Sequence, residues 1–394
     1  MINEDRLHAL DAVRASALLL GIVLHSTMSF FLPIPAMDVS QSPLLAGLFY
    51  VIHIFRMSLF FLIAGFFAHM VFHRRGAQAF IRDRFKRIAL PMLVGWVIIS
   101  PMLGAIVIWG LIRTFGVEAG AGAEPPDMGL PLTHLWFLYY LCIFYAGTLT
   151  LRYLLVEVLD KSGTLKKIAD KFVSTLVPSV CGPLIFGLPL AFVLHNAPVW
   201  HAWFGLPTPD YGLTPQLPAI AGYGFAFSLG WLMHRQTNLL NKVRARGLFN
   251  LAIAIALTIV CLTMAGVAPS MELPFSNSPD WHKPVYVLCY TMAIWFWVFA
   301  IIGSAMRLLS APSARWRYLA DASYWMYLAH LPIVFFLQVI VAQWPLHWVI
   351  KFPLILVVTT ALLLLSYHTL VRPTRLGRWL NGKSVPRHRL VSQN

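Results

Sequence analysis

The sequence is poor in charge and in cysteine. Asp, Glu, Lys and Arg make up 11% of the 394 residues, whereas 59% of the residues are hydrophobic. Soluble domains carry about a quarter charged residues, so this composition excludes a soluble globular protein and indicates an integral membrane protein. The four cysteines lie in apolar segments with no close pair. They are interpreted as buried thiols, and not as a disulfide framework or a metal site.

What charge there is has a strong bias. The net charge is +15, from 30 basic and 15 acidic residues. A nucleic-acid partner would be one explanation, but the basic residues are scattered among short loops that flank apolar segments. The preference of basic loops for the cytoplasmic side of a membrane explains this scatter better. We therefore expect a lipid bilayer as the partner and no nucleic acid.

Apolar segments recur along the whole chain. About ten of them approach the ~20 residues that a helix needs to cross a bilayer. They cover residues 10–32, 46–73, 88–112, 134–156, 175–195, 217–234, 247–267, 284–306, 321–343 and 348–371. The fifth, which contains Pro178, Pro183 and Pro189, and the short, glycine-rich sixth are the weakest. The sequence predicts an all-α integral membrane protein, a bundle of about ten transmembrane helices that forms one domain over residues 1–394.

The loops predict the orientation of this bundle. Basic residues gather after the second, fourth, sixth and eighth segments and in the C-terminal tail, whereas the alternate loops hold only Arg113, Lys283 and Lys351. This alternation places both termini in the cytoplasm. The first apolar segment contains Arg14 and His25 and lacks a convincing cleavage site, so we expect a retained helix and not a signal peptide.

Several ionisable residues fall inside these segments. Arg14 and His25 are eleven positions apart, which places them about 20° apart around a helix and about 16 Å apart along it. His53 and Arg56 share one face of the second segment at a depth similar to that of His25, and His330 lies near the middle of the ninth. Ionisable groups at such depths usually face a bundle interior or a wet cavity and are candidate functional residues.

Each residue also has a structural interpretation. Arg14 alone fits an interfacial residue paired with Asp11, and His25 alone fits a helix–helix hydrogen bond. Three histidines suit a metal or haem, but no carboxylate is evident at that depth, so we expect no metal site. Arg56 is the hardest to explain structurally, because it lies eight or more residues from either surface and needs a partner or water.

Two further groups lie near the membrane surfaces. His134 and Trp136 are expected at the outer interface, where Trp136 fits either a membrane anchor or a sugar-binding surface. Arg82, Arg84 and Arg87 begin the third segment, where they serve topology first and phosphate binding in addition.

Together these stretches resemble the membrane-bound acyltransferase-3 family. The resemblance rests on Arg14, ten intervening residues and His25, and then on residues 52–57 (IHIFRM), 60–67 (FFLIAGFF), 84–91 (RFKRIALP), 134–138 (HLWFL) and 322–332 (ASYWMYLAHLP). Each stretch is weakly specific alone, but their order and spacing cover nearly the whole chain. One departure is Ala64, where the family usually has serine, so no hydroxyl role carries over to that position.

The resemblance implies a function. Such proteins move an acyl group from a cytoplasmic thioester, usually a coenzyme A ester, to a sugar hydroxyl across the membrane. This chain is similar to a branch that succinylates periplasmic glucans of Gram-negative bacteria. It therefore implies a multi-pass protein of the bacterial inner membrane, with succinyl-CoA or acetyl-CoA as donor substrate, a glycan acceptor and no permanently bound cofactor. The sequence is also compatible with a homodimer.

The residues then suggest roles within that reaction. The nucleotide end of coenzyme A would lie among Arg82, Arg84 and Arg87, and its arm would pass Arg14 toward His25. His25 would act as general base or carry a transient acyl group, with His53 and His330 beside it. Arg56 would stabilise the oxyanion, and His134 and Trp136 would hold the sugar.

The main alternative is a secondary transporter that exports a sugar or lipid. His25, His53 and His330 would then form a proton relay, and the proline-broken fifth segment fits such a protein. However, no inverted repeat is evident, and intramembrane carboxylates are nearly absent. A scaffold protein does not explain Arg56.

Overall fold

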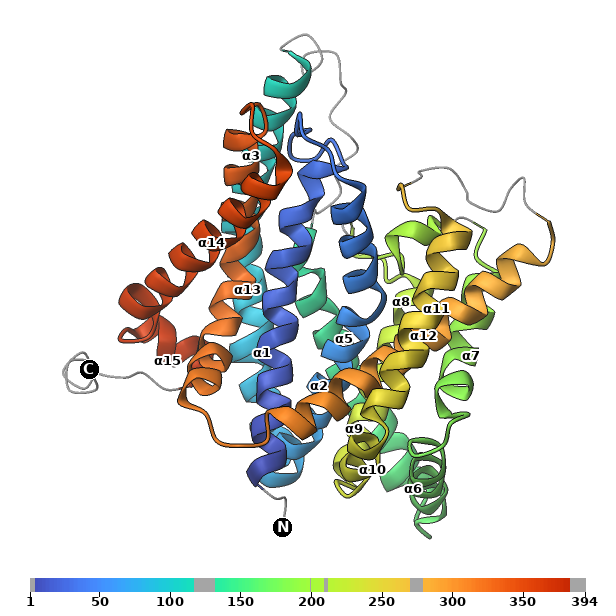
Figure 1. Cartoon of the computed structure of the whole chain (residues 1–394). Coiled ribbons are helices and arrows are strands. Elements are labelled where there is room, and N and C mark those ends of the chain that lie inside the picture. The colour runs from blue at the N-terminus through green and yellow to red at the C-terminus, as the bar shows by residue number, and fades with distance from the viewer. Residues whose placement is uncertain (1–3, 117–131, 199, 209–211, 270–278, 383–394) are drawn as a thin grey trace.

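The computed structural model describes residues 4–116, 132–198, 200–208, 212–269 and 279–382 of the chain. Long helices packed side by side form the molecule, and no strand occurs in these ranges (Figure 1). The elements are α1 (Glu4–Thr27), η1 (Met28–Phe30), α2 (Pro43–Arg84), η2 (Phe85–Ala89), α3 (Leu90–Phe115), η3 (Thr133–Leu135), α5 (Trp136–Arg152), η4 (Tyr153–Leu159), α6 (Thr164–Leu176), α7 (Gly182–His195), η5 (Ala202–Phe204), α8 (Leu217–Ala219), η6 (Ile220–Gly224), α9 (Phe225–His234), α10 (Leu239–Ala245), α11 (Gly247–Ala265), α12 (His282–Leu308), α13 (Ala314–Val341), α14 (Trp348–Ser366), η7 (Tyr367–Val371) and α15 (Arg375–Asn381).

Seven helical segments of the described chain are long and apolar enough to cross a membrane. One of them, Pro43–Phe115, has 73 residues. A straight helix of that length would measure about 110 Å, far more than the ~30 Å of a bilayer core. The chain instead runs along α2, breaks at Gly76 (φ 76°) and returns along α3 (Figure 1). The seven segments therefore contain eight of the ten predicted spans. The all-helical fold is confirmed, and its long apolar helices are consistent with a membrane protein.

The other two predicted spans correspond to shorter or less apolar helices. Residues 175–195 contain α7, an apolar helix of 14 residues, and residues 217–234 contain α8, η6 and α9. Neither is among the seven long apolar segments. The start of α1 lies at the same end of the bundle as α6 and α10, which carry basic residues (Figure 1). The count of ten and the cytoplasmic termini stay predictions.

Close backbone packing joins α2 to α9. A Cβ atom at Gly65 would collide with the carbonyl oxygen of Phe227, and one at Gly230 would collide with the carbonyl oxygen of Leu62. Glycine is therefore required on both helices, because any side chain would force the backbones apart. This contact fixes α9 against the middle of α2, the helix that carries His53 and Arg56.

A buried ion pair ties the turn between α1 and α2 to α14. Lys351 Nζ lies 2.8 Å from Asp38 Oδ1, and both side chains are fully buried. Lys351 Nζ also donates to the carbonyl oxygen of Ala342 at 3.1 Å. Lys351 lies in α14, within the predicted segment 348–371, and joins the turn that holds Asp38 to the connection that holds Ala342.

Candidate functional site

Four elements bring four histidines together inside the bundle. His25 comes from α1, His53 from α2, His134 from η3 and His330 from α13. The ring of His330 lies 5.2 Å from that of His25 and 5.3 Å from that of His134, centroid to centroid. His53 is within electrostatic range of His25. The histidines predicted to meet at one level, His25, His53 and His330, therefore do lie in one cluster.

The hydrogen bonds in this cluster assign the tautomers of two imidazoles. His330 Nδ1 donates to the carbonyl oxygen of Tyr327 at 2.7 Å. In the neutral imidazole, Nε2 is then the unprotonated nitrogen and can accept a proton. That Nε2 atom is buried and has no hydrogen-bond partner among the described residues. His134 Nε2 donates to the carbonyl oxygen of Leu328 at 3.2 Å. His134 is thus anchored to α13, whereas His330 presents a free basic nitrogen.

Arg56 adds a cation to the cluster. Its guanidinium packs against the backbone of Gly21 in α1, where an added Cβ would lie 2.5 Å from Nη1. The phenol groups of Tyr223 and Tyr327 are close enough to interact electrostatically with Arg56. Within the part of the chain that the structure describes, no carboxylate pairs with Arg56, and its Nε atom is buried without a hydrogen bond. A buried guanidinium without a carboxylate is poised to bind a developing anion.

An aromatic loop covers the other side of His53. The ring of His53 lies 5.0 Å from Phe49, which in turn stacks on Trp203 at 5.6 Å. Gly205 (φ 77°) approaches so closely that a Cβ there would lie 2.8 Å from His53 Cδ2. The sequence did not single out Trp203 or Gly205, because only the folded loop brings them to α2.

The structure corrects the expected position of His134. It was placed at the outer interface, but its side chain is only 7% exposed and packs on His330 and Tyr327. The cause is local: Thr133 has a positive φ of 47°, and the 3-10 turn η3 begins α5 inside the bundle. Tyr327 fixes this turn by donating its hydroxyl to the carbonyl oxygen of His134 at 2.7 Å.

Trp136 also lies within the aromatic interior. It is half-buried and stacks on Tyr223, with ring centroids 5.7 Å apart. Tyr223 is itself one of the phenols near Arg56. Trp136 therefore connects to the cluster through one ring and does not stand at the outer surface as expected.

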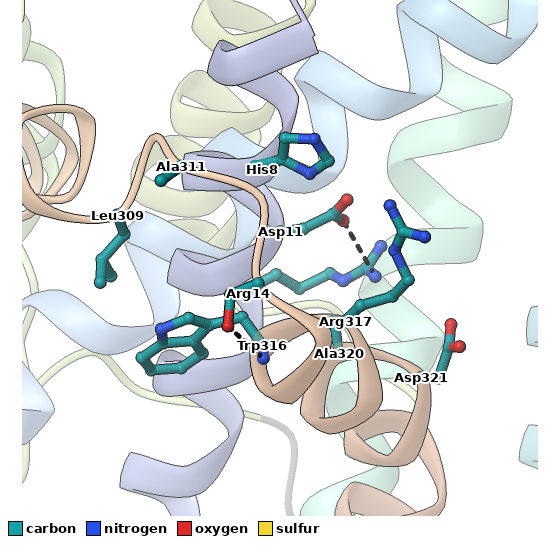
Figure 2. A pocket seen from close by; sticks show the side chains of 10 residues that line it. His8, Asp11, Arg14, Leu309, Ala311, Trp316, Arg317, Ala320 and Asp321 are labelled. Atoms are coloured by element: carbon teal, nitrogen blue, oxygen red, sulfur yellow. Dashed lines mark hydrogen bonds and ion pairs between the residues drawn. The ribbon is translucent and has the colours of Figure 1, made fainter. Parts of the chain in front are cut away.

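Arg14 lines a pocket between the start of α1 and the start of α13. Arg14 Nη2 pairs with Asp11 Oδ1 at 3.1 Å, as the structural interpretation expected (Figure 2). The pocket has a volume of about 180 Å³, and Trp316 and Arg317 of α13 face it together with His8 (Figure 2). Sequence reasoning missed Trp316 and Arg317, because nothing in their spacing relates them to Arg14.

The basic segment at the end of α2 is organised around Asp83. This carboxylate pairs with Arg84 and Arg87 at 3.2 Å each, and the guanidinium of Arg84 also lies 5.2 Å from the Phe80 ring centroid. Arg84 and Arg87 are therefore engaged in ion pairs with Asp83, whereas Arg82 is exposed. Through its carbonyl oxygen, Arg87 accepts a hydrogen bond from Tyr324 at 2.6 Å, which brings this segment to α13.

The central cluster combines a basic nitrogen with a guanidinium that has no carboxylate partner among the described residues. A neutral imidazole can take a proton from a hydroxyl, and a guanidinium can stabilise the anion that forms when the hydroxyl attacks a carbonyl. Among the described residues, no group of three or more His, Cys, Asp or Glu side chains is arranged to hold a metal ion. The arrangement suits acid–base chemistry on an acyl group.

Comparisons with known proteins agree with this chemistry. A family model described as an acyltransferase domain, of the acyltransferase-3 type, matches residues 7–368. The chain is similar to the glucans biosynthesis protein C of Escherichia coli strain K12, with 24% identity over 356 residues, covering 85% of this chain and 84% of that protein. It is 23% identical over 353 residues to the protein of the same name from E. coli O139:H28, with the same coverage. No solved structure matches significantly.

Proposed function

This chain belongs to the acyltransferase-3 family, and we propose that it transfers an acetyl or succinyl group from cytoplasmic acyl-CoA to a hydroxyl of a periplasmic or cell-surface glycan. The observation that carries the proposal is the pairing of His25 and His330 beside Arg56, a cation without a carboxylate partner in the described chain. Glucan is the acceptor we favour, because the related E. coli proteins are named for glucan biosynthesis. The bacterial inner membrane is the proposed location.

The chemistry needs one base and one anion-stabilising group. The imidazole of His25, with His330 beside it, takes the proton of the acceptor hydroxyl. At the same time the hydroxyl oxygen bonds to the thioester carbon. Arg56 stabilises the negative charge that develops on the carbonyl oxygen. The carbon–sulfur bond then breaks, and the thiolate recovers the proton as free coenzyme A. In the alternative route, His25 attacks the thioester carbon, and the thiolate of coenzyme A leaves. The acyl group then passes from the acyl-histidine to the acceptor hydroxyl, whose proton goes to the thiolate.

The two substrates would approach from opposite ends of the bundle. We assign the donor to the end that holds Arg14, Trp316 and Arg317, since cations suit the phosphates and an indole suits the adenine of coenzyme A. Arg82 and Arg87 lie on the adjoining segment. The pantetheine arm of coenzyme A, on the order of 15–20 Å long, is comparable to the ~16 Å rise from Arg14 to His25. The acceptor would reach His53 past the Phe49–Trp203 stack.

Release of free thiol tests the proposal. The purified protein should release coenzyme A from succinyl-CoA or acetyl-CoA faster when glucan is added, and the product glucan should carry the acyl ester. His25→Ala should lower the rate at least ~100-fold, because it removes the proposed base. His195→Ala, an exposed histidine at the end of α7, is the matched control and should retain activity.

Two results would contradict the proposal. One is a His25→Ala protein that transfers acyl groups at more than about a tenth of the wild-type rate. The other is sugar accumulation in vesicles without any thioester cleavage, which would favour a transporter in which the histidines relay protons.

A further inference from the structure

Gln338 is a fully buried polar residue that no step above uses. It lies in α13, eight positions after His330 and so about 12 Å further along the helix. Its side chain is 0% exposed. A buried amide is costly unless it is hydrogen-bonded, so its partners indicate its purpose.

The amide of Gln338 binds the backbone of the candidate catalytic histidine. Its Nε2 atom donates to the carbonyl oxygen of His25 at 2.9 Å and to that of Ser26 at 3.1 Å. Both carbonyls belong to the last turn of α1, which ends at Thr27 before the 3-10 turn η1. The last four carbonyls of an α-helix lack partners within the helix, so a buried helix end needs donors from elsewhere.

The same helix contacts His25 twice. The Cα–Cβ bond of a helical residue tilts toward the N-terminus of its helix, so the ring of His25 leans back from the end of α1. There it meets His330, with ring centroids 5.2 Å apart. Gln338 holds the backbone of His25, and His330 contacts its ring. The Nδ1 atom of that ring also contacts the sulfur of Met28 at 3.4 Å.

We propose that Gln338 is a positioning residue that holds the end of α1 so that the His25 ring stays aligned with His330 and Arg56. This role rests on the acyl transfer proposed above. Gln338 touches no reacting atom, and it acts by fixing the backbone to which the ring of His25 is attached. A displacement of about 1 Å at a reacting group can lower a rate ~100-fold, so loss of these hydrogen bonds should affect the chemical step.

Gln338→Met tests the role, because methionine has a similar length and cannot donate a hydrogen bond. We expect kcat to fall about 10- to 100-fold, while the KM for acyl-CoA stays within about twofold of wild type. Gln343→Met is the matched control. Gln343 is exposed and donates to the carbonyl oxygen of Met37 at 3.4 Å, so it has a similar bond without contact to His25. Its kcat should stay within about twofold of wild type.

A purely structural role would lower the melting temperature or the yield of Gln338→Met without lowering the kcat of the folded fraction, and that result would overturn the proposal. If Gln338→Met does not fold, Gln338→Asn replaces it. Asparagine keeps the amide but is one methylene too short, so the same loss of kcat is expected, and a wild-type kcat would refute the role.

His25→Ala, measured in parallel, separates the two proposals. If His25→Ala is inactive and both Gln338 variants keep the wild-type kcat, only the positioning role fails. If His25→Ala keeps more than about a tenth of the wild-type rate, or if the wild-type protein cleaves no thioester, the proposed function fails and the positioning role fails with it.

Discussion

Gly21→Ala should disturb the proposed site while leaving the fold intact. Gly21 lies in α1, four positions before His25, and faces the guanidinium of Arg56. A Cβ atom at position 21 would lie 2.5 Å from Arg56 Nη1, whereas ordinary van der Waals contact begins at 3.4 Å. The nitrogen must therefore retreat by about 1 Å. It can do so without unfolding the protein, because it is the far end of a flexible side chain.

The two effects of this substitution have opposite signs. Alanine in a helix interior is favoured over glycine by about 0.5–1 kcal/mol, so the melting temperature should stay constant or rise. If Arg56 stabilises the oxyanion, displacing it by about 1 Å should cost part of the ~10²–10³-fold that such a donor contributes to kcat. We expect kcat to fall about 10- to 100-fold with little change in either KM.

The assay measures kcat, both KM values and the melting temperature on the same detergent-purified sample. Gly47→Ala is the control, since Gly47 lies in α2 and has open space where its Cβ would be. Its kcat should equal that of the wild type. A Gly21→Ala protein with wild-type kcat would refute the assignment of Arg56 to the transition state, because the substitution moves the guanidinium whatever its role.

Two more outcomes follow from the two ends of the bundle. Arg14→Ala should raise the KM for acyl-CoA about tenfold, the cost of one charge-assisted hydrogen bond, with the acceptor KM unchanged; an unaltered donor KM would leave Arg14 only its ion pair with Asp11. Lys351→Met should destabilise the protein by about 3–5 kcal/mol in thermal unfolding, because it strands the buried carboxylate of Asp38. A second substitution, Asp38→Asn, should recover most of that loss, and a Lys351→Met protein as stable as wild type would contradict this interpretation.

Helical periodicity and depth were readable from the sequence. The spacing of His53 and Arg56 predicted one face, and the depth of His25 and His330 predicted one level; both follow from fixed helical rise and rotation. The structure brings these residues together. Their catalytic roles remain predictions, because position alone does not define a reaction.

Features that depend on helix ends and on contacts between helices were not readable. His134 was misplaced because hydropathy does not reveal that Thr133 adopts a positive φ and starts α5 inside the bundle. Gln338 gave no signal, since a single amide in an apolar helix does not indicate which backbone it will bind. The role of Trp316 in lining a pocket could not be predicted either, because only the packing of α13 on α1 creates that pocket.

The glycine contacts between α2 and α9 bear on how the protein is made. Residues 217–234 read as a weak span because they are rich in glycine, yet Gly230 is what allows α9 to lie directly on the backbone of α2. A short segment of this kind is expected to depend on the helix it packs against for much of its stability. Because α2 precedes α9 in the chain, α9 can make this contact only after α2 has been synthesised. We therefore expect the placement of α9 to depend on its contact with α2 as well as on its own hydropathy.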